Sequence, residues 1–355
     1  MNMITRSCTT EQPSDWKSQL RDAYRDAKQL LNALSIDADT VNLSHTATEL
    51  FPFLVTRAYA QRMRPGDPHD PLLRQVLPVT NETMIRDGYV DDPVGEHSLL
   101  GNSSLIQKYH GRGLLMVTAA CAINCRYCFR RAFPYSEIVG GKRLKRAIGL
   151  IAEDTSLTEI ILSGGDPLII DDEQLAAIFG ELNAIPHIKR IRIHTRLPIV
   201  LPDRINNDLL DILASSDHST VIVVHVNHPH ELDGNTKDAL RRFRAAGVTL
   251  LNQSVLLRGI NDNADVLSTL SSELFSAGVM PYYINLLDRV SGTAHFEVDE
   301  EKASSLEQAL IARLPGYLLP KFVREIPGAP AKLALRNTKE SSISYGGAGF
   351  SDNWF

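Results

Sequence analysis

The sequence lacks several features that would place it outside the cell or in a membrane. It has four cysteines in 355 residues, and three of them lie within eight positions, so there is no framework of spaced disulfides. No apolar run approaches the length of a membrane-spanning helix, and the N-terminus has no basic stretch followed by an apolar core. We therefore expect a cytoplasmic protein in a reducing compartment that has no membrane partner.

An excess of basic charge is also missing. The chain has 42 acidic and 37 basic residues, which gives a formal net charge of -5, and the two signs are intermixed. A nucleic-acid-binding surface needs a basic patch or stripe. The sequence therefore predicts no nucleic-acid ligand, while its length allows one large core with an appendage.

The clustered cysteines are the strongest chemical signal in the chain. Cys121, Cys125 and Cys128 form a CxxxCxxC motif directly after the apolar run 114–118, and the fourth cysteine, Cys8, is far away in the sequence. A structural zinc site normally has four protein ligands, and His110 is the candidate for a fourth. Three cysteines alone fit a 4Fe-4S cluster better, with one iron left open for another ligand.

This motif at the end of an apolar strand resembles the signature of the radical S-adenosyl-L-methionine (SAM) enzymes. The resemblance implies that Cys121, Cys125 and Cys128 bind a 4Fe-4S cluster and that SAM chelates the open iron. The alternative is a partial zinc site or a buried cysteine cluster.

Short apolar runs recur after residue 113, with helical stretches between them. The predicted strands are 114–118, 159–162, 191–194, 221–226, 250–257 and 281–287, and helices are expected at 173–182, 238–246 and 265–277. The repeat is about 30 residues, the size of a βαβ unit. Either an open doubly wound α/β sheet or a barrel fits this pattern. The radical SAM resemblance favours a partial (β/α)6 barrel with its active site at the C-terminal strand ends.

Three regions follow from this pattern. We expect an N-terminal helical region at 1–105, the partial barrel at 106–315 and a C-terminal segment at 316–355. One helix is expected to start at Ser14 and to run past Leu30, and a second to start at Thr46, where Thr46 and Glu49 fit a capping box.

Polar motifs follow several of the predicted strands. Resemblance to the family assigns to the SAM pocket the glycine-rich motif Gly164-Gly165-Asp166, and also Arg196, His228 and Gln253. Glycines there permit close backbone approach. His225, His228 and His230 leave a zinc site as the alternative interpretation.

Near the C-terminus, the stretch Ile326-Pro-Gly-Ala-Pro-Ala-Lys332 resembles the loop of the lysine 2,3-aminomutases that carries the lysine for pyridoxal 5'-phosphate (PLP). The resemblance implies a Schiff base between Lys332 and PLP, with Arg112 near the PLP. Burial in a pocket of low dielectric would favour the neutral amine that this linkage needs.

The same resemblance assigns the substrate, L-lysine. Arg130 matches the arginine that binds the substrate carboxylate, and Asp288 and Glu325 match two acids that hold its ε-ammonium. Glu325 departs from the family, which has an aspartate there, and Tyr127 stands where a histidine is usual.

The implied reaction converts L-α-lysine to (R)-β-lysine by a radical migration of the amino group, with an electron donor such as flavodoxin or ferredoxin. The chain ends at Phe355 without the C-terminal cysteines of the clostridial enzymes. This short form resembles the branch that supplies β-lysine to a separate ligase for the modification of elongation factor P.

Two other functions stay open. One is a radical SAM and PLP aminomutase acting on glutamate or arginine, although two acids suit an amine-bearing side chain better. The other is a non-enzymatic relative that keeps the cluster as a structural or redox element, which the presence of Lys332 disfavours.

Overall fold

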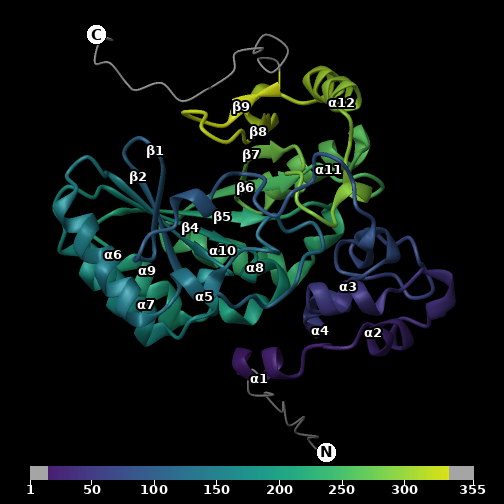
Figure 1. Cartoon of the computed structure of the whole chain (residues 1–355), viewed down its shortest axis with the longest axis horizontal. Coiled ribbons are helices and arrows are strands. Elements are labelled where there is room, and N and C mark those ends of the chain that lie inside the picture. The colour runs from purple at the N-terminus through teal and green to yellow at the C-terminus, as the bar shows by residue number, and fades with distance from the viewer. Residues whose placement is uncertain (1–14, 336–355) are drawn as a thin grey trace, which may run out of the picture.

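The protein is built on one nine-stranded sheet, seen in a computed structural model that describes residues 15–335 (Figure 1). Cys8, Ser14 and the last twenty residues lie outside this range. The strands are β1 (Leu105–Tyr109), β2 (Arg112–Thr118), β3 (Glu159–Gly164), β4 (Arg190–Thr195), β5 (Ser219–His225), β6 (Thr249–Val255), β7 (Met280–Asn285), β8 (Lys321–Arg324) and β9 (Leu333–Ala334).

The strands lie side by side in chain order, from β1 to β9. Those from β2 to β8 run parallel, while β1 and β9 each add an antiparallel partner at one end. A doubly wound sheet reverses its strand order at a switch point, and this sheet has no reversal. The predicted partial (β/α) barrel is therefore confirmed, and the six expected strands correspond to β2 through β7.

Helices follow the parallel strands and cover the outer side of the sheet. The α-helices are α1 (Trp16–Arg21), α2 (Ala27–Ala33), α3 (His45–Leu50), α4 (Arg57–Ala60), α5 (Tyr135–Ile138), α6 (Gly141–Glu153), α7 (Asp172–Asn183), α8 (Leu197–Val200), α9 (Asn207–Ala214), α10 (Gly234–Ala245), α11 (Ala264–Ser276) and α12 (Glu300–Arg313). Six of them, α6, α7, α9, α10, α11 and α12, complete six strand–helix units.

Strand β4 shows how the sequence directs side chains to the two faces. Ile191 and Ile193 are fully buried in the core beneath the helices, whereas Arg192 and His194 alternate with them and line a central cavity. Because successive strand residues point to opposite faces, this alternation places polar groups inside the barrel.

The N-terminal helices differ from the prediction, and Figure 1 shows α1 to α4 gathered at one side of the molecule. The single helix expected from Ser14 is two short helices, because the backbone of Tyr24 pairs with Val55 between them and Asp26 caps the second. The helix expected at Thr46 begins at His45, where the Ser44 hydroxyl accepts from the Ala47 amide. The prediction at Thr46 was wrong about the capping residue, whereas Ser14 lies outside the described residues and Asp15 caps α1.

The expected region boundaries near 105 and 315 do not mark separate sheets. Strand β1 begins at Leu105 and pairs with β2, and strands β8 and β9 extend the same sheet within the C-terminal segment. The loop from 325 to 332 is therefore carried between two strands of the barrel sheet, which fixes Lys332 against it.

Candidate active site

A cavity of about 380 Å³ lies inside the barrel and opens at the C-terminal strand ends. It collects side chains from β1 to β7 and from the loops around the cysteine motif and β8. The predicted site residues that line it are Cys121, Cys125, Cys128, Arg112, Arg130, Gly164, Gly165, Asp166, Arg196, Gln253, Asp288, Glu325 and Lys332. His228 is the one predicted site residue that does not line it.

The three cysteines of the motif occupy the loop after β2, and all are free and partly buried. Burial raises the pKa of Cys128 to about 11 and that of Cys121 well above its usual range. Neutral thiols in an apolar pocket become good ligands once a metal supplies positive charge. Three thiols on one short loop fit a 4Fe-4S cluster, in which each cysteine binds a different iron.

A buried ion pair ties the cysteine loop to the N-terminal region. The fully buried guanidinium of Arg126 contacts the carboxylate of Glu82 at 2.7 Å and donates to the carbonyl oxygens of Phe51 and Ala47. Arg131 contacts the same carboxylate at 2.7 Å. Sequence reasoning missed Glu82, because nothing local distinguishes it from a surface acid.

The glycine-rich motif packs against the cysteine loop. A Cβ atom added to Gly164 or Gly165 would overlap the carbonyl oxygens of Thr118 and Ala120, and Gly164 has a φ of +128°. The Gly164 carbonyl accepts a hydrogen bond of 2.8 Å from the Tyr135 hydroxyl. These glycines thus permit a close approach to the backbone just before the cysteine motif, and their role toward SAM stays a prediction.

Asp166 joins two strand ends. Its carboxylate accepts from the Thr195 hydroxyl and from the Arg196 amide, both at 2.7 Å. Burial raises its pKa, and these hydrogen bonds pull the pKa back down. In this arrangement Asp166 orients the residues after β4.

Arg196 is the centre of a buried polar network. Its guanidinium lies 2.6 Å from Sγ of Cys125, 2.7 Å from the Tyr127 hydroxyl and 2.8 Å from a Glu231 carboxylate oxygen. The same guanidinium reaches Gln75 at 2.7 Å. Arg196 thereby fixes the position of Cys125, a predicted cluster ligand.

Tyr127, where the family has histidine, takes part in this network. Its hydroxyl accepts from Asn227 at 2.7 Å, and its ring stacks on His225 with centroids 5.7 Å apart. Neither Tyr127 nor His225 belongs to a site for a single metal ion. Among residues 15–335, no three His, Cys, Asp or Glu side chains are placed to bind one metal ion together.

The neighbouring His228 faces elsewhere. Its ring accepts a hydrogen bond from the His230 amide at 3.1 Å, and the two rings are edge-on. Within the motif Asn227-His228-Pro229, the residue that contacts the cavity network is therefore Asn227, not the histidine that was predicted.

The lysine predicted to bind PLP also lines the cavity. Nζ of Lys332 donates to Asn285 Oδ1 at 2.7 Å and lies 3.5 Å from a carboxylate oxygen of Glu325. Burial raises the pKa of Asp288 to about 7. Within the described chain, no hydrogen bond or ion pair engages the Asp288 carboxylate, so it is available to a cation.

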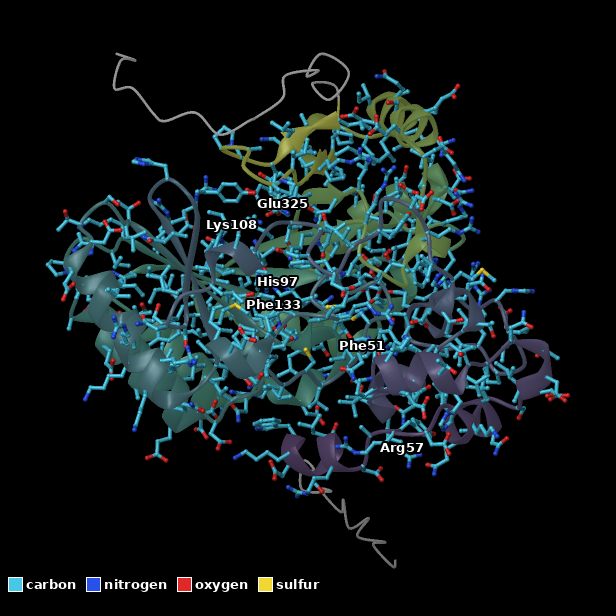
Figure 2. The ribbon with its side chains drawn as sticks, in the orientation of Figure 1. Phe51, Arg57, His97, Lys108, Phe133 and Glu325 are labelled. Carbon is cyan, nitrogen blue, oxygen red and sulfur yellow. The ribbon has the colours of Figure 1, made fainter. Side chains whose placement is uncertain are left out.

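Arg130 is paired with an acid that the sequence did not single out. It makes a two-point contact with Glu96, at 2.8 Å and 3.0 Å, and donates to the Ser163 hydroxyl at 3.0 Å. Glu325 is likewise in contact with Lys108, and Figure 2 labels both residues. Glu96 and Lys108 are the main additions that the structure makes to the predicted site.

Cationic side chains at the base of the cavity suit a phosphate. Arg112 lies over the Tyr109 ring, 4.9 Å from its centroid, and Arg192 lies 2.8 Å from Glu159. Beside them, Nε2 of His194 is buried without a hydrogen-bond partner in the described chain, and burial lowers the pKa of this histidine well below its usual range. Such a donor set fits the anionic end of PLP.

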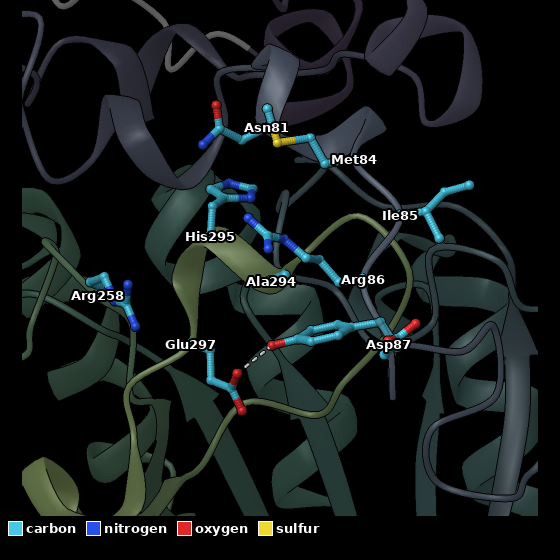
Figure 3. Close-up of a pocket in the computed structure, with 10 residues that line it drawn as sticks. Asn81, Met84, Ile85, Arg86, Asp87, Arg258, Ala294, His295 and Glu297 are labelled. Atoms are coloured by element: carbon cyan, nitrogen blue, oxygen red, sulfur yellow. Dashed lines mark hydrogen bonds between the residues drawn. The ribbon is translucent and has the colours of Figure 1, made fainter.

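A second cavity, of about 710 Å³, lies away from these residues (Figure 3). It is lined by Asn81, Met84, Ile85, Arg86, Asp87, Tyr89, Arg258, Ala294, His295 and Glu297. The Tyr89 hydroxyl donates to Glu297 at 2.7 Å there. None of the predicted site residues lines it, so the chemistry belongs to the smaller cavity.

Comparison with known proteins adds three findings. The profile of the radical SAM superfamily matches residues 115–270. L-lysine 2,3-aminomutase of Escherichia coli K12 is 48% identical over 329 residues, which cover 92% of this chain and 96% of that protein. The enzymes of the same name from Buchnera aphidicola and Clostridium subterminale are 43% and 32% identical, covering 93% and 90% of this chain and 98% and 77% of theirs.

No helix within residues 15–335 has both the length and the apolar character needed to span a membrane.

Proposed function

Because this chain belongs to the lysine 2,3-aminomutase family of radical SAM isomerases, we propose that it converts L-α-lysine to (R)-β-lysine in the barrel cavity. The observation that carries the proposal is the content of that one cavity. It is lined by the three cysteines and also by Lys332, Asp288 and Glu325.

The cofactors of this family are a 4Fe-4S cluster, SAM and PLP. When bound, they supply the radical and the conjugated system through which the amino group migrates. Cys121, Cys125 and Cys128 would hold three irons of the cluster, and Gln253, Arg196 and the glycine motif border the space for SAM. Lys332 would bind PLP, with Arg112 at its anionic end.

The residues of the chain would orient the substrate. A buried ε-ammonium needs opposite charge close by to offset its lost hydration. Asp288 provides a carboxylate that forms no hydrogen bond or ion pair with a described side chain, and Glu325 lies near it. Arg130 offers a planar guanidinium suited to the substrate carboxylate, and Glu96 orients this guanidinium.

Exclusion of water and oxygen is the second task of the barrel. The cavity walls include fully or largely buried apolar side chains, among them Ile106, Ile123 and Leu287. A dry cavity strengthens the electrostatic contacts to the substrate and protects a radical from side reactions.

A substrate screen tests this function. The protein, loaded anaerobically with iron, sulfide and PLP, is given SAM, dithionite and either lysine, arginine or glutamate. We expect consumption of lysine, because the two acids disfavour glutamate and the cavity end at Asp288 suits a single ammonium. Consumption of arginine or glutamate in place of lysine would reject the proposed substrate.

We also propose that the product serves the modification of elongation factor P through a separate ligase, with flavodoxin or ferredoxin as the reductant. Support comes from the resemblance to the short branch of the family and from the higher identity to the Escherichia coli enzyme, 48%, than to the clostridial one, 32%. Mass spectrometry of elongation factor P from a strain deleted for this chain would show loss of the β-lysyl mass if the proposal holds.

A further inference from the structure

A continuous chain of five charged side chains crosses the cavity. Arg130 contacts Glu96 at 2.8 Å, and Glu96 lies 3.9 Å from Nζ of Lys108. Lys108 in turn contacts Glu325, which lies 3.5 Å from Nζ of Lys332. The charges alternate in sign along the whole chain, so each buried group has a neighbour of opposite charge.

Two of the three inner members of this series, Glu96 and Lys108, are not among the residues that the sequence predicted for the site. Their side chains are 4% and 13% exposed, so both are costly to bury without partners. Lys108 also donates to the Val94 carbonyl at 3.1 Å, and the Glu96 amide donates to Asp92 at 2.8 Å. The Lys108 side chain is therefore anchored to the backbone of the segment that carries Glu96, and the backbone of Glu96 is itself fixed by Asp92.

These two residues connect the two ends of the proposed substrate site. Arg130, the candidate for the substrate carboxylate, is held by Glu96, while Glu325, a candidate for the ε-ammonium, is held by Lys108. Lys108 is on strand β1, and Arg130 follows the cysteine loop. The contact between Glu96 and Lys108 therefore ties together the positions of two anchors that come from different parts of the fold.

The charge balance also depends on Lys108. Glu325 lies near Asp288, and the two carboxylates raise the cost of ionising each other. The Lys108 ammonium neutralises the Glu325 carboxylate. The single ε-ammonium of the substrate is then enough to neutralise the Asp288 carboxylate. Without Lys108, Lys332 would be the one remaining ion-pair partner of Glu325 among residues 15–335, and Lys332 is needed for the cofactor.

We propose that Lys108 and Glu96 are positioning residues that fix the distance between the carboxylate end and the ammonium end of the site, and so select an amino acid of the length of lysine. The inference rests on the proposed function, because it requires both substrate ends to bind in this cavity. Ornithine, one methylene shorter, is the competitor that the arrangement rejects. Discrimination of one methylene is typically about 10- to 200-fold.

The test compares Lys108→Met, Lys108→Arg and Glu96→Gln with the unchanged protein. Dissociation constants for lysine and ornithine are read from the absorbance change of the PLP-loaded protein without SAM, so that binding is measured without turnover. KM and kcat for lysine are then measured under reducing conditions. Lys321→Met on β8 and Glu301→Gln on α12, both at exposed positions, serve as matched controls.

We expect Lys108→Met to weaken lysine binding by roughly tenfold or more and to lower the preference for lysine over ornithine by a similar factor. Glu96→Gln should act in the same direction, KM should change more than kcat, and Lys108→Arg should recover most of the preference. Both control variants should behave as the unchanged protein does.

An unchanged preference in folded Lys108→Met and in Glu96→Gln would overturn the inference. If Lys108→Met does not fold, Lys108→Gln, which keeps a polar end, is measured in its place. If Lys108→Met, Lys108→Gln and Glu96→Gln all fail to fold, the two residues are needed for folding and the selective role is rejected. The proposed function is judged separately, since its failure would appear as an unchanged protein that forms no β-lysine.

Discussion

The guanidinium of Arg196 lies 2.6 Å from Sγ of Cys125 and 2.8 Å from a carboxylate oxygen of Glu231. One side chain thereby joins the cysteine loop to the ends of β4 and β5. Glu231 is fully buried, and its carboxylate also accepts from the Asn227 amide at 2.9 Å. The cysteine loop is thus held by a polar network that connects it to the ends of two strands.

Arg196→Met should destabilise the fold, because it leaves the carboxylate of Glu231 buried without its cation. We expect the free energy of unfolding to fall by about 3–5 kcal/mol, measured by urea titration of the cofactor-free protein. The double variant Arg196→Met/Glu231→Leu should lose less than Arg196→Met alone. As a control, Arg241→Met breaks an exposed pair with Asp238 and should cost roughly 0–1 kcal/mol.

Cys125→Ala should abolish the cluster and leave the PLP site intact, because Cys125 lies in the loop after β2, whereas Lys332 lies between β8 and β9 and contacts Asn285 of β7. Cluster binding is measured by the iron content and the broad visible absorbance after reconstitution. PLP binding is measured by the PLP absorbance. Cys8→Ala, which changes the one cysteine outside the motif, is the control. A Cys125→Ala protein with full iron content and activity would refute the cluster assignment.

The parallel strands and the position of the cysteine motif could be predicted from the sequence. The strands β2 to β7 carry β-branched apolar runs at regular spacing, and the cysteine motif follows the first of them. Such local patterns predict elements well. Strand β9 has two residues, Leu333 and Ala334, and β1 pairs only as an antiparallel edge, so neither had a signal of its own.

The ion-pair and hydrogen-bond partners of the site residues could not be predicted from the sequence. Glu96 and Lys108 look like ordinary surface charges in the sequence, and they meet Arg130 and Glu325 only through the fold. Likewise, the His228 ring accepts a hydrogen bond from the His230 amide, while the Asn227 side chain donates to the Tyr127 hydroxyl. The conformation of the turn after β5 determines which of the two side chains points to the cavity. Ion pairs between distant segments depend on tertiary contacts that spacing does not encode.

Lys332→Ala should remove covalent attachment of PLP. Borohydride treatment of the PLP-loaded protein is expected to fix the cofactor to Lys332, since its Nζ points into the cavity beside Asn285. Peptide mapping by mass spectrometry locates the label, and Lys321→Ala is the matched control. A label on another lysine, or none, would remove Lys332 from the cofactor site.

Asp288→Asn should abolish the pH dependence of lysine binding near neutrality. Burial raises the pKa of Asp288 to about 7, so the carboxylate becomes charged, and binds an ammonium, as the pH rises through about 7. Lysine affinity of the unchanged protein should therefore increase over this range, measured by titration of the PLP-loaded protein. The variant should show no such step and should lose roughly 2–5 kcal/mol of transition-state binding.

The same raised pKa predicts an effect on stability. Between about pH 4 and pH 7 the unfolded Asp288 is ionised and the folded one is protonated, so this group makes the folded state less stable as the pH rises. Asp288→Asn should flatten that part of the stability curve. A pH dependence identical to that of the unchanged protein would show that Asp288 is ionised throughout.

Glu325→Asp tests the departure from the family at this position. The shorter side chain withdraws the carboxylate from Lys108 and Lys332, by about 1.5 Å if extended. We expect slower turnover or erosion of the (R) configuration of β-lysine, with cluster and PLP spectra unchanged. Chiral chromatography gives the answer, and an unchanged rate together with an unchanged configuration would show that Glu325 does not set the pose of the substrate.

The most direct test of the central claim is the product formed from L-lysine by the anaerobically reconstituted protein. The complete mixture contains iron, sulfide, PLP, SAM and dithionite, and parallel mixtures omit SAM, PLP or dithionite one at a time. The account predicts (R)-β-lysine in the complete mixture alone, with none from the Cys125→Ala or Lys332→Ala protein. β-Lysine formed without SAM, or its absence from a mixture in which cluster, SAM and PLP are all shown to be bound, would contradict it.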